Sequence, residues 1–103
     1  MSDDLKFDFA KDRHDLIPPE AITALAKILT HGATKYGPRG WERGMEWGRL
    51  YAATQRHLLA FWAGENNDPE SAHPHLWHAL TNIAFLLTYQ RRGIGNDDRP
   101  EVR

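Results

Sequence analysis

Three segments of this chain repeat their apolar residues at helical spacing, and a glycine follows each of them. Two adjacent prolines open the first segment, and proline is favoured in the first turn of a helix. Glycine suits the position just beyond a helix, so the three glycines mark the expected helix ends. The pattern predicts helices over about 18–36, over about 46–63, and from about 71 or 73 to 92.

The loops between these segments are short, which favours antiparallel packing and an all-α fold with three main helices. A length of 103 residues is near the size of one domain, so we expect a single helical domain over residues 1–103. The polar segment 1–17 predicts an extended N-terminal arm, and the polar segment 94–103 predicts a disordered tail. Three helices leave apolar rows uncovered, which predicts a homo-oligomer that completes the core.

Composition argues against several classes of protein. The sequence has no cysteine, which excludes disulfides and thiolate metal sites. Its net charge is −1, which gives no strong nucleic-acid footprint. No apolar run approaches the length of a membrane span, and the first residues lack a signal-peptide core. We therefore expect a cytoplasmic protein that has no membrane partner.

The segment DPESAHPHLWHAL, residues 68–80, holds three histidines directly after two carboxylates. His75 and His78 share one stripe of the third predicted helix, and His57 lies on the inward row of the second. Because an antiparallel hairpin joins these helices, we expect His57 to face His78. Carboxylates of the connecting loop complete a predicted divalent-metal site, whose ligands would be His57, Glu65, Asp68, His75 and His78.

This metal site has an alternative, because no motif of fixed metal-ligand spacing is present. Imidazole with carboxylate suits Mn, Zn, Fe or Ni better than Mg. In the alternative, His73 caps the third helix and His75 is solvated. His57 and His78 are then core histidines that bond to the backbone or to each other.

A second group of residues, in the segment KYGPRGWERGMEWGR, alternates cations with aromatic rings and glycines. Arginine binds phosphate in a bidentate manner, and an aromatic ring stacks on a base. The segment predicts a nucleotide-binding site formed by Lys35, Tyr36, Arg39, Trp41 and Arg43. The alternative is a surface loop whose tryptophans are anchored in the core. Lys11 and Arg13 form a smaller basic patch in the arm, which by itself is typical of a solvated charge run.

Two long segments resemble one known family: KFDFAKDRHDLIPPEAITALAKILTHGATKYGPRGWERGMEW and RHLLAFWAGENNDPESAHPHLWHALTNIAFLL. They are similar to the N-terminal domain of the phage and bacterial dATP/dGTP diphosphohydrolases, from about residue 6 to 90. The resemblance implies hydrolysis of purine deoxynucleoside triphosphates to monophosphate and pyrophosphate, in the host cytoplasm if a phage encodes the chain. The chain is also similar in scale and helicity to the MazG-type all-α pyrophosphatases. Those enzymes hold Mg with ExxE and ExxD motifs, and ExxE is absent from the second predicted helix here.

The resemblance also implies roles for single residues. A divalent metal would bind the triphosphate and activate water, with Mn or Mg expected first and Zn, Fe or Ni as alternatives. Glu70 would be the catalytic base. Asn82 would hold a ligand imidazole or the sugar, and Lys11 and Arg13 would belong to the substrate site.

Three positions depart from the family pattern. Ala10, Gly40 and Ala72 stand where the family usually has Gly, Asn and Gly. The first and third departures would stiffen loops, and the second removes a polar contact beside Trp41. Two rival functions stay open: a non-catalytic phage accessory module that binds a nucleotide or a host protein, and a structural helical oligomer with buried histidines.

Overall fold

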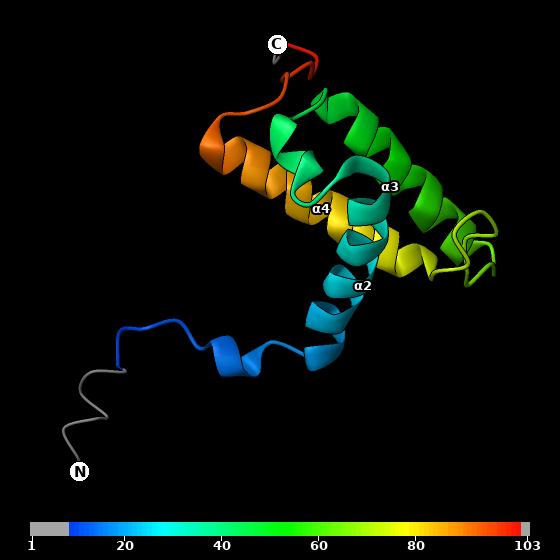
Figure 1. Ribbon diagram of the computed structural model, residues 1–103, viewed down its shortest axis with the longest axis horizontal. Helices are drawn as coiled ribbons and strands as arrows, with labels where there is room; N and C mark the ends of the chain where they lie inside the picture. The colour runs from blue at the N-terminus through cyan, green and yellow to red at the C-terminus, as the bar shows by residue number, and fades with distance from the viewer. Residues whose placement is uncertain (1–8, 102–103) are drawn as a thin grey trace.

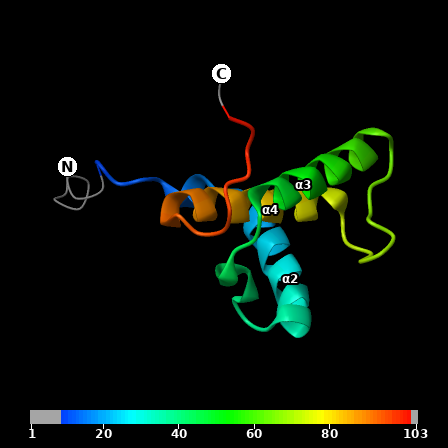
Figure 2. The same ribbon diagram turned by 90° about the horizontal axis from the view of Figure 1, so that it is seen from above.

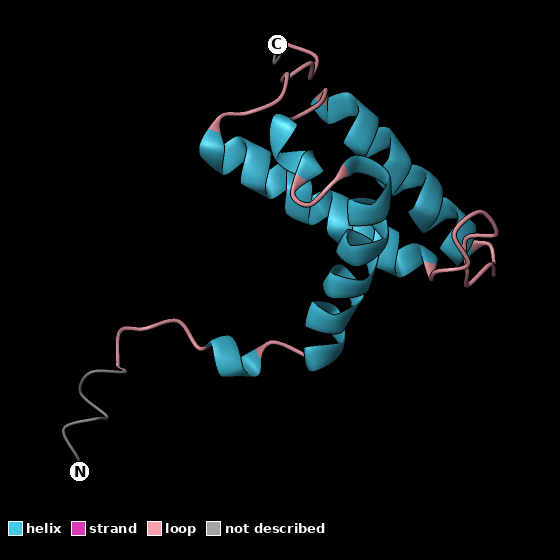
Figure 3. Cartoon of the chain, viewed as in Figure 1, coloured by secondary structure: helices cyan, strands magenta, loops and turns pink. Residues whose placement is uncertain are grey.

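The computed structural model describes residues 9–101, and over that part of the chain it contains helices and loops but no strand (Figure 3). The predicted all-α fold and its three main helices are confirmed. None of the described helices is long and apolar enough to cross a membrane. In chain order the elements are η1 (His14–Leu16), α2 (Pro19–Tyr36), η2 (Gly40–Arg43), α3 (Trp47–Trp62) and α4 (His75–Arg92).

The helices end at or next to the positions that the glycines in the sequence indicated. The residue after α4, Gly93, adopts the left-handed conformation, with a φ of 68°, and its N–H donates to Tyr89 O at 2.8 Å. The start of α4 lies a few residues later than predicted, because the preceding loop folds on itself. In that loop, Asp68 N–H donates to His73 O at 2.8 Å, and His75 N–H donates to Asn66 O at 2.9 Å.

Helices α3 and α4 lie side by side and antiparallel, and we call them the α3–α4 pair (Figure 1). Leu50 and Thr54 of α3 are buried, as are His75 and Ala79 of α4. Helix α2 packs against α4 and η2 and lies to one side of the pair (Figure 2). Helix α2 therefore covers only one side of the layer that α3 and α4 form.

A single buried phenol fixes the connection between α2 and α3. Tyr89 of α4 is fully buried, and its hydroxyl donates to Trp41 O of η2 at 2.6 Å. A buried hydroxyl needs a hydrogen-bond partner, so this bond satisfies Tyr89 while it holds η2 against α4. The position of η2 sets the position of the basic and aromatic side chains around it.

The described part of the N-terminal arm, residues 9–17, projects away from the helices (Figure 1). Its apolar side chains Phe9 and Leu16 are 91% and 69% exposed. The remainder of the predicted arm, residues 1–8, lies outside the described part of the chain.

The segment after Gly93 differs from the expected disordered tail, because it is docked on the start of α3. Asn96 pairs with the segment before α3: its N–H donates to Met45 O at 3.2 Å, and its carbonyl accepts from Trp47 N–H at 2.9 Å. The indole N–H of Trp47 also donates to Ile94 O at 3.0 Å. This docking has no periodic sequence pattern, so it could not be predicted from apolar spacing.

Asp98 of this docked segment occupies the role of a helix N-cap. Its Oδ1 accepts a hydrogen bond at 2.7 Å from Gly48 N–H in the first turn of α3, whose own N-cap residue provides no side-chain bond. We predict that Asp98→Ala lowers the free energy of unfolding by about 1 kcal/mol, the usual value of a cap. Urea unfolding followed by circular dichroism measures this change.

Asp97→Ala is the matched control. Asp97 bonds only Arg99 and does so at an exposed site, so its loss should cost less than about 0.5 kcal/mol. Equal effects of the two substitutions would show that Asp98 does not cap α3.

Candidate functional site

A cleft of about 1160 Å³ lies between the C-terminal half of α2, η2 and the loop that precedes α4. The basic segment and the acidic loop, which are far apart in the sequence, form its walls. The volume is sufficient for a ligand the size of a nucleotide. The predicted residues that line the cleft are Lys35, Tyr36, Arg39, Trp41, Arg43, Asp68, Glu70 and His78.

One wall of the cleft is cationic. Lys35 comes from the end of α2, and Arg39 and Arg43 come from the loop and η2 that follow. All three side chains are exposed, and Arg43 donates to Tyr36 O at 3.3 Å. Arg49, which ends the basic segment but was not among the predicted site residues, lines the same wall from the first turn of α3. The cleft therefore has several cations available for an anionic ligand.

The two aromatic candidates differ in their surroundings. The Trp41 ring stacks on Phe85 of α4, with ring centroids 5.4 Å apart and planes 19° apart, and Arg92 lies 5.4 Å from its centroid. Trp41 is therefore anchored on α4, which matches the alternative in which it packs against the core. Tyr36 is 63% exposed at the rim of the cleft, so its ring is the aromatic surface more open to a ligand.

The opposite wall is a hydrogen-bonded turn built on Asp68. Its Oδ1 accepts from Glu70 N–H at 3.1 Å, and its Oδ2 accepts from the Ser71 hydroxyl at 3.2 Å. Because that hydroxyl has one proton, His78 Nε2–H must donate to Ser71 Oγ, at 2.7 Å. Partial burial raises the pKa of Asp68, but the hydrogen bonds from Glu70 and Ser71 outweigh it and lower the pKa overall. The sequence analysis had missed Ser71, which joins the acid to the imidazole.

Behind His78, away from the cleft, a carboxylate and two imidazoles form a hydrogen-bonded chain. His75 Nε2–H donates to Glu65 Oε1 at 2.6 Å, because a carboxylate oxygen can only accept. In the tautomer that carries its proton on Nε2, the Nδ1 of His75 is an acceptor, and it receives the Nδ1–H of His57 at 2.8 Å. The chain ends against the cleft wall, where the His57 ring stacks on His78 at 4.7 Å and 12°.

The predicted pairing of His57 with His78 is thus present, but as a stack of rings. The alternative in which core histidines bond each other also holds in part, since His57 bonds His75. His75 is 5% exposed, so it is not solvated. His73 makes no cap bond at the start of α4, whose N-cap residue is Pro74.

The five predicted metal ligands are neighbours, but their arrangement does not fit a metal ion. Both nitrogens of His75 already have partners. A ligated metal lies in the plane of an imidazole, and the nearly parallel planes of His57 and His78 do not converge. Within residues 9–101, no three His, Asp or Glu side chains are placed to hold one ion.

Burial sets the protonation of the two stacked rings. Removal from water lowers the pKa of His57 from its ordinary value of 6.5, and positive charge on His75 would lower it further. The pKa of His78 is lowered by burial first and by His57 second, although Asp68 opposes the shift. The 3.7 Å approach of His78 to Asp68 is therefore a contact with a neutral imidazole near neutral pH.

Three residues predicted for substrate binding are not among the residues that line the cleft. Lys11 and Arg13 lie on the projecting arm, and Arg13 is bonded to Asp15 at 2.8 Å. Asn82 lies on α4 but outside the cleft lining. The structure therefore separates Lys11 and Arg13 from the main group because the arm projects away from the helices (Figure 1), and it separates Asn82 because that residue is not in the cleft lining.

One family departure has a physical consequence in the acidic turn. Ala72 has a φ of 64°, in the left-handed region that glycine adopts more easily than alanine. Ala72 follows Ser71 directly, so the turn that holds Asp68 and His78 contains backbone strain of about 1 kcal/mol.

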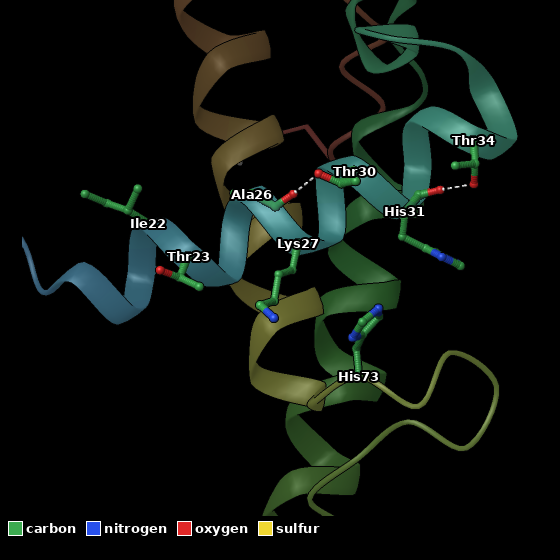
Figure 4. Close-up of a pocket in the computed structure, with 8 residues that line it drawn as sticks. All are labelled: Ile22, Thr23, Ala26, Lys27, Thr30, His31, Thr34 and His73. Atoms are coloured by element: carbon green, nitrogen blue, oxygen red, sulfur yellow. Dashed lines mark hydrogen bonds between the residues drawn. The ribbon is translucent and has the colours of Figure 1, made fainter.

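A second, smaller cavity of about 520 Å³ lies along α2 and includes His31 and His73 (Figure 4). The hydroxyls of Thr30 and Thr34 face this region, but they donate to Ala26 O and His31 O of their own helix. None of the predicted site residues lines it. The cleft beside η2 is therefore the better candidate.

Comparison with known proteins matches this chain to a known family. The family described as dATP/dGTP diphosphohydrolase, N-terminal, matches residues 1–99. A protein of Salmonella phage PMBT28 named dATP/dGTP diphosphohydrolase is 32% identical over 95 residues, which are 92% of this chain. The chain spans about a third of that relative, 32% of its length. No solved structure matches the chain.

The lowered histidine pKa values predict a loss of stability in acid. The unfolded chain takes up protons near pH 6.5, whereas folded His57 and His78 resist protonation until a lower pH. The free energy of unfolding should therefore fall as pH drops from about 7 to about 5. Asp68 titrates below its ordinary value of 3.8, outside this window. Urea midpoints measured across this range test the prediction.

His57→Gln should flatten this pH dependence, because one buried imidazole is removed. His14→Gln is the control, since His14 is exposed on the arm and its replacement should leave the slope unchanged. A wild-type stability that stays constant between pH 7 and pH 5 would contradict the assignment.

Proposed function

The chain belongs to the dATP/dGTP diphosphohydrolase N-terminal domain family, and from this premise we propose that its cleft binds and hydrolyses a purine deoxynucleoside triphosphate. The products would be the deoxynucleoside monophosphate and pyrophosphate. The observation that carries the proposal is the joining of a cationic wall and an acidic turn around one cleft of nucleotide size. The matched phage protein is three times longer, so the activity of this shorter chain is itself part of the proposal.

The cationic wall is suited to the triphosphate. Lys35, Arg39 and Arg43 are exposed and come from three neighbouring turns of backbone, so they can surround one polyphosphate. Arginine contributes paired N–H donors, and lysine contributes a compact charge. These contacts would neutralise charge that builds on the leaving pyrophosphate.

Tyr36 is suited to the base. Its ring is exposed at the rim, beside the cations, whereas Trp41 is held by Phe85 and Arg92. Stacking on a phenol ring recognises any base by its face, so it supports binding without explaining a preference for purines. Trp41 would act by holding the wall of the cleft in place.

Glu70 is suited to the role of base. Its exposed side chain lines the cleft, and its N–H is held by Asp68, which fixes the backbone at that point. In the proposed step, Glu70 takes a proton from water while the water oxygen bonds to the α-phosphorus. The bond from the α-phosphorus to the bridging oxygen breaks, and pyrophosphate leaves with that electron pair.

We predict that Glu70→Gln lowers pyrophosphate release from dATP or dGTP by about 10² to 10⁴ while nucleotide binding stays within about threefold, because general base catalysis has this magnitude. Arg43→Ala should instead weaken binding by about tenfold, as one charge-assisted contact is lost. Pyrophosphate detection and calorimetric titration separate the two effects.

Glu20→Gln and Arg56→Ala are the matched controls, because both residues are exposed and lie outside the cleft. Binding that depends on Arg43 without any turnover would favour the non-catalytic nucleotide-binding module. Absence of both binding and turnover would remove the cleft as the site.

The requirement for a divalent metal stays a prediction, with Mn or Mg expected first. We predict that EDTA abolishes turnover but leaves the melting temperature unchanged, because three of the four ring nitrogens of His57 and His75 are already bonded within the protein. Addition of Mn or Mg should restore turnover. A melting temperature that rises with metal would show that the five predicted ligands rearrange around an ion.

A further inference from the structure

The smaller cavity along α2, which we call the second cavity, contains three basic side chains. They are Lys27 and His31 of α2 and His73 of the loop that precedes α4. No carboxylate is among the described residues that line it, although the chain has 14 acidic residues and only 13 lysines and arginines. The rest of the lining is uncharged and consists of Ile22, Thr23, Ala26, Thr30 and Thr34.

The three basic side chains come from two segments and flank one opening (Figure 4). Lys27 and His31 are one helical turn apart, so they lie on the same face of α2. His73 extends from the loop toward that face, and its ring centroid lies 5.7 Å from that of His31, with the ring planes at 74°. A ligand between α2 and the loop could therefore contact all three groups.

Trp77 of α4 holds two of these groups in place. The ammonium of Lys27 lies 5.9 Å from the centroid of the Trp77 ring, within the range of a cation–π contact. The His73 ring stacks on the same indole, with centroids 5.8 Å apart and planes 25° apart. The backbone N–H of His73 also donates to Ser71 Oγ at 3.2 Å, which ties it to the acidic turn. Part of the ordering that a ligand would otherwise require is therefore already present.

The polar atoms of these three side chains are available to a ligand. Within residues 9–101, the hydrogen bonds of imidazole rings are made by the other four histidines. The ion pairs of the same residues are made by arginines and by two other histidines. An imidazole has at least one N–H to donate, and an ammonium has three. The second cavity thus offers several N–H donors and a positive charge.

Such a set of groups fits an oxyanion better than a metal ion. The ammonium of Lys27 repels a cation, and the described residues place no three His, Asp or Glu side chains around one ion. A phosphate accepts hydrogen bonds from all three groups, and bonds in which donor or acceptor is ionised are roughly twice as strong as neutral ones. Positions one turn apart on a helix are about 5–6 Å apart at Cβ, so two linked phosphates reach more of the donors than one phosphate does.

The second cavity adjoins the cleft, because Ala26, Thr30 and His31 line both of them. The reaction proposed for the cleft releases pyrophosphate, which is two linked phosphates. We propose that Lys27, His31 and His73 form a phosphate-oxyanion site, and that this site takes up the pyrophosphate that leaves the cleft. The choice of pyrophosphate rests on the proposed function, whereas the binding of an oxyanion rests on the second cavity alone.

NMR signals of the imidazole rings test the proposal at fixed pH and ionic strength. Titration of the wild-type chain with inorganic pyrophosphate, in the presence of EDTA, should shift the His73 ring signals with a dissociation constant of about 1 mM or lower. His73 is the specific reporter, because it lines the second cavity and is not in the cleft lining. The signals of His14, which is exposed on the arm, should not move. Orthophosphate should bind about tenfold more weakly, since it reaches fewer donors.

Lys27→Gln should weaken the binding of pyrophosphate by about tenfold, because it removes the ammonium from an exposed position where the fold does not need it. Arg91→Gln is the matched control, since Arg91 is exposed on α4 and lines neither cavity. Arg43→Ala alters the cleft and should leave the His73 response within about twofold.

Four results would overturn the proposal: a His73 signal that does not move, equal affinity for orthophosphate and pyrophosphate, full affinity in Lys27→Gln, or a response lost in Arg43→Ala. The outcome is distinct from that of the proposed function. Release of pyrophosphate from dATP or dGTP without a His73 response would contradict this inference alone. A His73 response to added pyrophosphate in a chain without turnover would contradict the proposed function alone.

Discussion

The antiparallel packing of α3 on α4 is the constraint on which the rest of the structure depends. It forces the chain to reverse between Trp62 and His75, and the reversal is held by the hydrogen bond from His75 N–H to Asn66 O. The same packing places imidazoles of both helices in contact. Buried imidazoles need partners, and the hydrogen-bonded chain behind the cleft provides them. The turn between Glu65 and His75 presents Asp68 and Glu70 to the cleft.

The cleft exists because a second interaction holds η2 against α4. The bond from Tyr89 to Trp41 O and the stack of Trp41 on Phe85 fix the loop after α2 at a definite distance from the acidic turn. Different residues therefore hold the walls of the cleft in place and face the ligand. Buried rings position the two walls, while exposed cations and one exposed phenol ring, that of Tyr36, remain available for a ligand.

The arrangement of the three helices also explains why the apolar core is small. Three helices in this arrangement form one layer of two helices with a third on one side, and the buried apolar side chains among residues 9–101 are only Ala24, Leu50, Ala79 and Tyr89. The cleft occupies space that a compact three-helix bundle would fill with side chains. So few buried apolar side chains give this domain a small core, as is usual for a domain of this size.

The sequence by itself determined the helices and their ends, because apolar period and glycine stops act locally, and the short loop gave the antiparallel order of α3 and α4. The expected antiparallel packing of all three helices was wrong for α2, which crosses the α3–α4 pair at a steep angle (Figure 1). The sequence also determined which residue types meet at the cleft, since the basic segment and the acidic loop each fall beside a helix end. Only the tertiary structure decided how they meet. The rings of His57 and His78 stack on each other, so their nitrogens do not point to a common ion. The segment around Asn96, which has no periodic pattern, is ordered because it docks beside Trp47. Such contacts depend on angles between distant segments, and spacing along the chain does not encode those angles.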